Sequence, residues 1–275
     1  MKTINIKIAN ANITIAIEDE IAPLIREYVF KYHSRYTNKK DEPKYIIQKE
    51  CDKYVITKNN RVVNRNRKIS NIVYDIETKI INEFLTKNKD KLIIHSACLI
   101  KDGKAHLFAG PAKSGKTTLS IFLANHDYLF AGDEFVMIDL KKKRIYPVVR
   151  NIILKPRINN DIIEMFNLPD DKLLKVSGYI YLDPSYFGKI AKIKFYPIEK
   201  IFFIDTFYET RTKKPGAVDI FNNFIEVVYN PYNIRRRLLE SINDLLTLAE
   251  YRLMKFKHPF FLNDEEEATL FKNLE

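Results

Sequence analysis

One octapeptide in the middle of the chain has the composition of an anion-binding loop. Residues 110–117 read Gly-Pro-Ala-Lys-Ser-Gly-Lys-Thr and match the pattern G-x-x-x-x-G-K-[ST] at every fixed position. Gly110 and Gly115 permit backbone angles that turn amide N–H groups inward, so that the loop forms a nest for phosphate oxygens at a helix N-terminus. A lysine and a hydroxyl at the end of such a loop serve the outer phosphates of a nucleotide and its Mg²⁺ ion. The chemistry indicated is the binding of ATP with Mg²⁺.

The predicted nucleotide-binding residues are consecutive. Lys116 is expected over the β- and γ-phosphates and counts as a catalytic residue, and the Thr117 hydroxyl is expected to bind Mg²⁺. The alternative is a chance match in an ordinary strand–turn–helix connection. The full predicted set is Gly110, Pro111, Ala112, Lys113, Ser114, Gly115, Lys116, Thr117 and Thr118.

Two acidic residues follow the loop after one short helical segment and one short strand. An apolar helical segment follows the loop, and residues 128–131 predict a strand that leads directly to Asp133 and Glu134. One helix and one strand bring the chain back beside its start, so this pair can reach the same phosphates. We expect Asp133 near an attacking hydroxyl, where it accepts the proton or holds Mg²⁺, and Glu134 as a second carboxylate on the metal side. The alternatives are a turn-forming aspartate and an exposed strand residue.

Strands with short connections surround the loop. Residues 92–100 and 105–109 predict two strands joined by an Asp-Gly turn, and residues 135–140 and 144–154 predict two extended runs joined by a charged turn. Connections this short pair strands antiparallel, whereas parallel pairing needs a longer crossover. We therefore expect an α/β fold in which part of the sheet is antiparallel.

The N-terminal part is predicted to be rich in β-structure. Isoleucines alternate with polar residues over the first 17 residues, and residues 44–48 and 54–57 indicate further strands. Residues 23–32 have helical spacing. Ser70 is expected to cap a longer helix with an apolar stripe. We predict a β-rich part over residues 1–68 and a larger core over residues 69–275.

The C-terminal third is predicted to be helical. Apolar residues over 234–253 recur at helical spacing, which is typical of a helix packed on a core. Residues 206–217 form a polar segment that contains Lys-Lys-Pro-Gly and could cover the site as a mobile loop.

Composition places the chain among folded proteins. Hydrophobic residues make up 46% and charged residues 29% of its 275 residues, so it can bury a core. Its apolar runs are only a few residues long, whereas a membrane-spanning helix needs about 20. The alternating first strand differs from an export signal, so we expect a cytoplasmic protein in which Cys51 and Cys98 are reduced, buried thiols. The two cysteines and five histidines show no metal-ligand spacing.

The net charge of +11 has two interpretations. Lysines and arginines are spread along the whole chain, which indicates a general bias that favours solubility. The other interpretation is an attraction for phosphates or for an acidic partner.

The residues around the loop resemble a kinase family. Residues 94–97 (Ile-His-Ser-Ala), the Asp-Gly turn, the loop through Thr118 and residues 129–134 (Leu-Phe-Ala-Gly-Asp-Glu) look like the catalytic core of HPr kinase/phosphorylase. The fit is better to the shorter HPr-kinase-like proteins, including those that phosphorylate lasso-peptide precursors. The resemblance covers residues 70–160. It implies a mixed-sheet P-loop core of the type found in ATP-dependent phosphoenolpyruvate carboxykinases, with phosphoryl transfer to a hydroxyl, usually of serine.

The resemblance also implies a role for His95. Spacing alone makes His95 a core residue of an apolar strand, but the family places a histidine here to contact the catalytic aspartate and tune its proton affinity. The family usually shows two adjacent aspartates where this chain has Gly132, Asp133 and Glu134. Either Asp133 and Glu134 are the pair, or Asp133 is the second member and Gly132 replaces the first. The glycine-rich, arginine-containing C-terminal signature of true HPr kinases is not found, so HPr is not the expected substrate.

Other basic residues are candidates for stabilising a transferring phosphoryl group. Arg150, Arg157 and Arg211 follow the core and either reach the site or lie on the surface. Lys155 stands near a place where family members often carry a lysine. Arginines at 235–237 oppose the dipole of the helix predicted there, and they either contact an anion or form a solvated turn.

These observations predict an ATP- and Mg²⁺-dependent kinase that phosphorylates a hydroxyl of a peptide, a protein or a small molecule. A regulatory switch that binds ATP without a dedicated acceptor is the alternative, and a nucleic-acid-binding ATPase rests only on the net charge. The predicted partners are the nucleoside triphosphate and the hydroxyl acceptor. No membrane or nucleic-acid partner is expected, and a homo-oligomer is left open.

Overall fold

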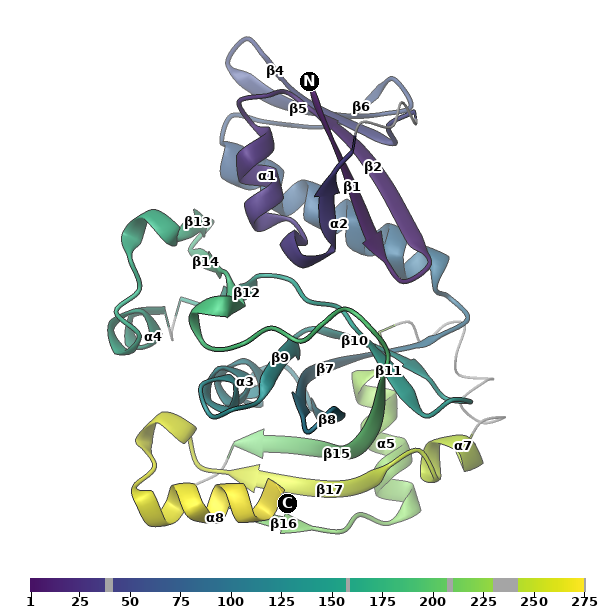
Figure 1. The fold of residues 1–275 in the computed structure, drawn as a ribbon, viewed down its shortest axis with the longest axis vertical. Coiled ribbons are helices and arrows are strands. Elements are labelled where there is room, and N and C mark those ends of the chain that lie inside the picture. The colour runs from purple at the N-terminus through teal and green to yellow at the C-terminus, as the bar shows by residue number, and fades with distance from the viewer. Residues whose placement is uncertain (38–41, 157–158, 207–209, 230–241, 275) are drawn as a thin grey trace. The chain divides into compact units, whose positions relative to one another are not determined.

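The computed structural model describes residues 1–37, 42–156, 159–206, 210–229 and 242–274. The chain divides into two compact units (Figure 1). Unit 1 comprises Met1–Asn88 and Val149–Tyr186, and unit 2 comprises Lys89–Val148 and Phe187–Glu275. These units are groups of residues in mutual contact, and the predicted domain division at residue 68 stays a prediction.

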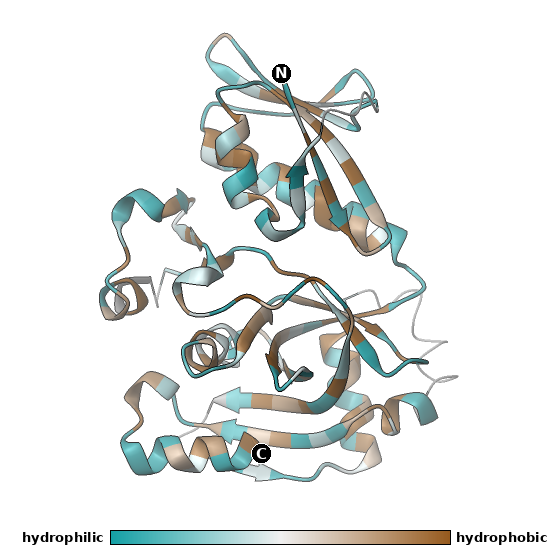
Figure 2. Cartoon of the chain, viewed as in Figure 1, coloured by the Kyte–Doolittle hydropathy of each residue, from teal (hydrophilic) through white to brown (hydrophobic). Residues whose placement is uncertain are grey.

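A six-stranded sheet forms the larger part of unit 1, with the strand order β3-β1-β2-β4-β5-β6. Alternation of isoleucine with polar residues buries one face of the first two strands, and Figure 2 shows the resulting hydrophobic and hydrophilic bands along β1 and β2. The strands of this sheet are β1 (Lys2–Ile8), β2 (Ala11–Ile17), β3 (Ser34–Tyr36), β4 (Tyr45–Glu50), β5 (Lys53–Lys58) and β6 (Arg61–Asn66). Of these, β1, β2, β4 and β5 were predicted and are confirmed, whereas β3 and β6 were not predicted.

Two helices accompany this sheet. Helix α1 (Ala22–Tyr28) lies between β2 and a short 3₁₀ turn (Lys31–His33), and α2 (Ile69–Lys87) buries an apolar stripe against the strands. The prediction that Ser70 caps α2 is wrong. The N-cap position is two residues earlier, at Lys68, and no side-chain hydrogen bond caps the helix, which is held by packing of its apolar stripe.

The second segment of unit 1 forms a small sheet of its own. Strands β12 (Ile152–Leu154), β14 (Tyr179–Leu182) and β13 (Leu174–Val176) pair antiparallel in that order. Helix α4 (Asn159–Met165) and 3₁₀ turns at Asp170–Lys172 and Pro184–Tyr186 connect them. The predicted extended run over residues 144–154 is thus two strands in different sheets.

An eight-stranded mixed sheet forms the framework of unit 2. Its main path runs β11-β10-β7-β8-β15-β17-β16, and β9 pairs with β7 beside this path. Strand β7 pairs antiparallel with β8, β9 and β10, whereas β15 pairs parallel with β8 and β17. The expected mixed α/β fold is confirmed. The strands are β7 (Leu92–Lys101), β8 (Lys104–Ala109), β9 (Leu129–Gly132), β10 (Phe135–Asp139), β11 (Arg144–Pro147), β15 (Tyr196–Thr206), β16 (Arg211–Lys213) and β17 (Glu250–Phe256).

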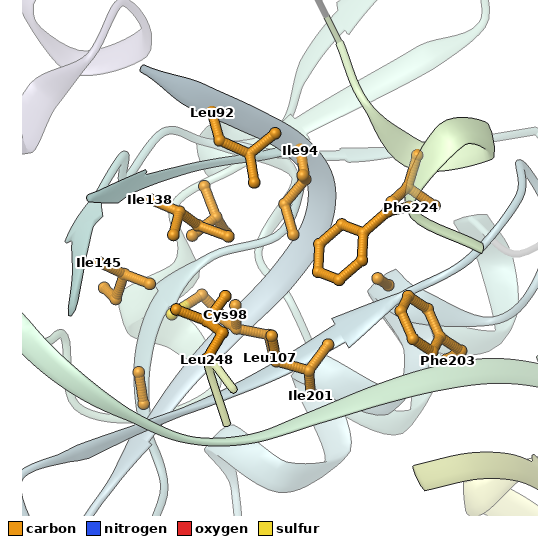
Figure 3. Close-up of a cluster of buried hydrophobic side chains, with 14 of the residues drawn as sticks. Leu92, Ile94, Cys98, Leu107, Ile138, Ile145, Ile201, Phe203, Phe224 and Leu248 are labelled. Atoms are coloured by element: carbon orange, nitrogen blue, oxygen red, sulfur yellow. The ribbon is translucent and has the colours of Figure 1, made fainter. Parts of the chain in front are cut away.

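Helices of unit 2 pack on this sheet. They are α3 (Lys116–Ala124), α5 (Ala217–Val227), α7 (Ile242–Leu246) and α8 (Asp264–Leu274), with a 3₁₀ turn at Pro259–Phe261. Figure 3 shows the core between α5 and the strands, where the rings of Phe224 and Phe203 meet edge to face with centroids 5.4 Å apart. Leu107 and Ile201, from the neighbouring β8 and β15, line the same cluster.

Two C-terminal predictions are corrected by the strands. The predicted helix over 234–253 is wrong at its end, because Glu250–Phe256 forms β17 and pairs in parallel with β15; residues 230–241 lie outside the described residues. The polar segment 206–217 contains β16, which pairs with β17, so it is not wholly a loop; residues 207–209 also lie outside the description.

The two cysteines differ in their environments. Cys98 is buried in β7, and burial raises the pKa of its thiol. Cys51 is exposed in a turn with a φ of 54°, so the prediction that both thiols are buried is wrong for Cys51. None of the helices that the structure describes has the length and hydropathy needed to cross a membrane.

Candidate functional site

The octapeptide forms a tight loop between β8 and α3. Strand β8 ends at Ala109, and α3 begins at Lys116 with Gly115 as its N-cap residue. Gly115 has a φ of 85° and Lys113 a φ of 72°, and the amide of Ser114 donates a hydrogen bond to the carbonyl of Pro111 at 3.3 Å. Left-handed residues ahead of a helix turn amide groups toward one side, and the first amides of a helix lack partners within it. The loop therefore has the form of an anion nest.

Gly110 is required by close approach at the start of this loop. A Cβ atom at this position would lie 2.6 Å from the carbonyl oxygen of Ile204 and 2.7 Å from Oγ of Ser114. Ile204 lies in β15, so any side chain at residue 110 would separate the loop from the sheet. The first glycine of the motif thus allows the loop to lie directly against the neighbouring strand.

The ammonium group of Lys116 lies over the loop. Its Nζ donates hydrogen bonds to the carbonyl oxygens of Gly110 and Pro111, both at 2.8 Å, and lies 3.5 Å from Oγ of Ser114. Lys116 is buried, with 5% of its surface exposed. A buried ammonium needs oxygen partners, and these three oxygens belong to the loop.

Asp133 meets the end of the loop. The hydroxyl Oγ1 of Thr117 donates a hydrogen bond to Oδ2 of Asp133 at 3.3 Å. Strand β9 pairs with β7 and carries the chain back from α3, which brings the carboxylate to the N-terminus of that helix. Asp133 is 6% exposed. The structure thus brings together the predicted lysine, hydroxyl and aspartate, while their roles stay predictions.

Gly132 lies in a backbone conformation that side chains rarely adopt. Its φ is 142°, and a Cβ atom there would lie 2.9 Å from the carbonyl oxygen of Val148. An aspartate at this position would strain the backbone and press against that carbonyl. This observation favours the alternative in which Asp133 and Glu134 form the acidic pair.

Glu134 lies beside His95. Across β7 and β10, His95 is paired in register with Phe135, and this places its Nε2 atom 3.7 Å from Oε1 of Glu134. Tyr229 completes the group, because its hydroxyl donates a hydrogen bond to the same Oε1 atom at 3.4 Å. Sequence reasoning missed Tyr229, since it follows α5 at a distance of 95 residues from Glu134 and belongs to no motif.

Three of these residues could take part in holding a divalent cation. Mg²⁺ prefers hydroxyl and carboxylate oxygens, and it commonly keeps water and phosphate oxygens as further ligands. Thr117, Asp133 and Glu134 supply that chemistry in unit 2. Within the described part of the chain, no group of three or more histidine, cysteine, aspartate or glutamate residues could hold a metal by itself.

The predicted basic candidates have other surroundings. Arg150 is buried in unit 1, where its Nη1 lies 3.8 Å from Oε1 of the buried Glu77, so it is not a surface charge. Arg211 is exposed in β16 of unit 2, and Lys155 is exposed in unit 1 after β12. Arg157 and the arginines at 235–237 lie outside the described residues.

The remaining histidines have structural surroundings. His33 is buried, its Nδ1 lies 3.2 Å from the carbonyl of Lys7, and its Nε2 accepts a hydrogen bond from the amide of Val149. Burial lowers the pKa of His33 to about 4, and burial with the nearby charge of Lys200 lowers the pKa of His106 to about 4. Both are neutral near pH 7, as core residues should be.

No protein-family model matches the chain, and neither does any curated protein. Among solved structures, the HPr(Ser) kinase/phosphatase from Coxiella burnetii is similar over 66% of this chain and 95% of its own, with 12% sequence identity and a TM-score of 0.30. A similarity of this size carries no argument about the activity of the present chain. The family resemblance therefore stays a prediction that rests on the motifs.

Proposed function

We propose that this chain is an ATP- and Mg²⁺-dependent phosphotransferase that transfers the γ-phosphate to a hydroxyl, with serine as the expected acceptor, of a peptide, a protein or a small molecule. The observation that carries the proposal is the 3.3 Å hydrogen bond between Thr117 and Asp133 at the N-terminus of α3. It joins the end of an anion-binding loop to a buried carboxylate, and phosphoryl transfer to nucleophiles needs both a phosphate nest and an acidic group for the metal.

Each group has a part in this proposal. The loop amides and Lys116 would hold the phosphates and neutralise charge on the transferring group. Thr117 and Asp133 would hold Mg²⁺, which supplies charge neutralisation when bound. Positioning accounts for most of catalysis in reactions of this class, and the close fit of the loop against β15 at Gly110 would keep the phosphates in place.

A regulatory protein that binds ATP without a dedicated acceptor is the second candidate. It is favoured by one observation: Asp133 stands between Gly132 and Glu134, whereas the resembled family usually has two adjacent aspartates. The two candidates differ in the fate of the phosphate. A switch releases inorganic phosphate slowly, whereas a kinase places label on an acceptor.

The test combines nucleotide binding with transfer. Lys116→Ala should weaken ATP binding at least tenfold by calorimetry, while Lys142→Ala, which removes an exposed charge of the same unit, should leave it unchanged. Wild-type protein incubated with γ-labelled ATP and an extract of cells that express it should label an acceptor. Equal ATP affinity of the Lys116→Ala and wild-type proteins would contradict the proposed loop, and phosphate release without any labelled acceptor would contradict the kinase.

A further inference from the structure

We infer that Glu134 is the carboxylate that meets the acceptor hydroxyl, that Asp133 serves the metal side, and that His95 and Tyr229 position Glu134. This inference rests on the proposed function. The sequence left two roles open for Asp133, proton acceptor or Mg²⁺ ligand, and the inference assigns it the metal. It assigns Glu134 to the acceptor hydroxyl, whereas the sequence predicts Glu134 on the metal side. It also adds Tyr229 as a positioning residue.

Exposure separates the two acids. An acceptor arrives from solution, so the carboxylate that touches its hydroxyl must be accessible. The side chain of Glu134 is 33% exposed, whereas Asp133 is 6% exposed. Asp133 also lies beside Thr117, the hydroxyl expected to bind Mg²⁺, at 3.3 Å. The buried acid thus belongs with the loop, and the accessible acid is available to a second substrate.

His95 is placed beside Glu134. Its Nε2 lies 3.7 Å from Oε1 of Glu134, and its own side chain is 26% exposed. The register between β7 and β10 fixes this placement, since His95 pairs with Phe135, the residue next to Glu134. An imidazole at this distance helps to fix the position of a carboxylate.

Tyr229 fixes the same carboxylate from another element. Its hydroxyl donates to Oε1 of Glu134 at 3.4 Å, and its ring meets the rings of His95 and Phe135 edge to face, with centroids 6.1 and 4.6 Å apart. The backbone amide of Tyr229 donates to the carbonyl of Ile93 at 2.9 Å. Tyr229 is therefore hydrogen-bonded to β7 two residues from His95. Its ring contacts the ring of His95, and its hydroxyl contacts the carboxylate of Glu134.

The proposed step transfers the γ-phosphate to the acceptor hydroxyl. Glu134 accepts the proton of the acceptor hydroxyl while the hydroxyl oxygen forms a bond to the γ-phosphorus. The bond between the γ-phosphorus and the β–γ bridging oxygen breaks, and its electron pair stays on the departing ADP. The proton on Glu134 then passes to water.

The first test separates the two acids. Glu134→Gln keeps the shape of the side chain and removes its charge, so a structural role predicts little change. We expect kcat for ATP hydrolysis, with water as the probe acceptor, to fall at least 100-fold, while the affinity for ATP with Mg²⁺ changes less than twofold. Glu134→Asp should retain more activity than Glu134→Gln, because it keeps a carboxylate. Asp133→Asn should reduce at least tenfold the factor by which Mg²⁺ increases the affinity for ATP. If Asp133→Asn does not fold, Thr117→Val should give the same reduction.

The second test addresses Tyr229. Tyr229→Phe removes only the hydroxyl, so we expect kcat to fall about three- to tenfold with unchanged ATP affinity, as loss of one hydrogen bond to a charged group predicts. Tyr229→Ala also removes the ring beside His95 and should cost more. The inference is overturned if Glu134→Gln keeps half of the wild-type kcat, or if Asp133→Asn loses turnover with unchanged Mg²⁺ dependence. Absence of ATP binding and turnover in the wild-type protein would instead overturn the proposed function.

Discussion

The hydroxyl of Thr117 donates a hydrogen bond to the carboxylate of Asp133, 3.3 Å away. Thr117 is the second residue of α3, and Asp133 directly follows β9. One helix and one strand therefore bring the chain from Thr117 back to it at Asp133. Their contact joins the loop and the acidic segment into one site within unit 2.

Replacement of Thr117 should separate packing from metal binding. Thr117→Ser keeps the hydroxyl and should bind ATP with a Mg²⁺ dependence within about threefold of wild type. Thr117→Val keeps the shape and loses the oxygen, so we expect at least tenfold weaker Mg²⁺-dependent binding. Calorimetric titration with ATP, with and without Mg²⁺, measures both. Indistinguishable titrations for the two variants would remove Thr117 from the metal site.

Gly132→Ala should destabilise the protein. The new Cβ would meet the carbonyl of Val148 at 2.9 Å in a backbone with φ of 142°, so strain and overpacking together should cost on the order of 3 kcal/mol. Gly103→Ala is the matched control, since its φ is 77° with no atom within 4 Å of the new Cβ, and it should cost about 1 kcal/mol. Urea unfolding compares the two. Equal losses would show that the Val148 contact is unimportant.

Much of the site followed from local pattern. The loop motif, the two strands joined by an Asp-Gly turn and the short return to Asp133 are properties of adjacent residues, so sequence was sufficient to predict that they meet. Tyr229 was not predictable, because its contact with Glu134 depends on how α5 ends against β7. The glycine at 132 was visible, but only its φ explains why no aspartate stands there.

Strand β17 shows the limit of periodicity. The residues before it have helical spacing, and the predicted stripe continued this spacing through Leu253. In the structure Glu250–Phe256 pairs with β15 on one side and β16 on the other. Pairing of a strand inside a sheet depends on its partners more than on its own sequence, so tertiary contacts overrode the local pattern.

The buried ion pair of unit 1 gives a stability prediction. Arg150→Met leaves the carboxylate of Glu77 buried without its guanidinium, and loss of one partner of such a pair typically costs about 3–5 kcal/mol. The double variant Glu77→Gln with Arg150→Met removes the buried charge as well and should be more stable than the single variant. Thermal and urea unfolding check this order. A double variant as unstable as the single one would show that charge burial does not set the cost.

Stability should also depend on pH through His33. Its pKa is lowered to about 4 by burial, against an ordinary value of 6.5, so the folded state binds fewer protons than the unfolded state between these values. The free energy of unfolding should therefore be greatest above pH 6.5 and fall as the pH decreases toward 4, by up to about 1.4 kcal/mol for each pH unit.

His33→Gln is the variant that tests this dependence. Glutamine can still accept a hydrogen bond from Val149, but it has no proton to gain, so its unfolding free energy should vary less between pH 7 and pH 5. Urea titrations at both values measure the difference. An unchanged pH slope would mean that another group causes the loss of stability in acid.

Strand β7 is bordered by β8 along one edge and by β9 and β10 along the other. Residue 95 pairs with Phe135 of β10, and the pairing of β7 with β8 begins at the next residue, Ser96. His95 thus belongs to a paired strand, whereas the glycine loop and Tyr229 lie outside the strands, so under the proposed function adjustment to acceptors of different size would come from these two segments. Under selection for a new acceptor, we would accordingly expect mutations in those two segments and none in β7.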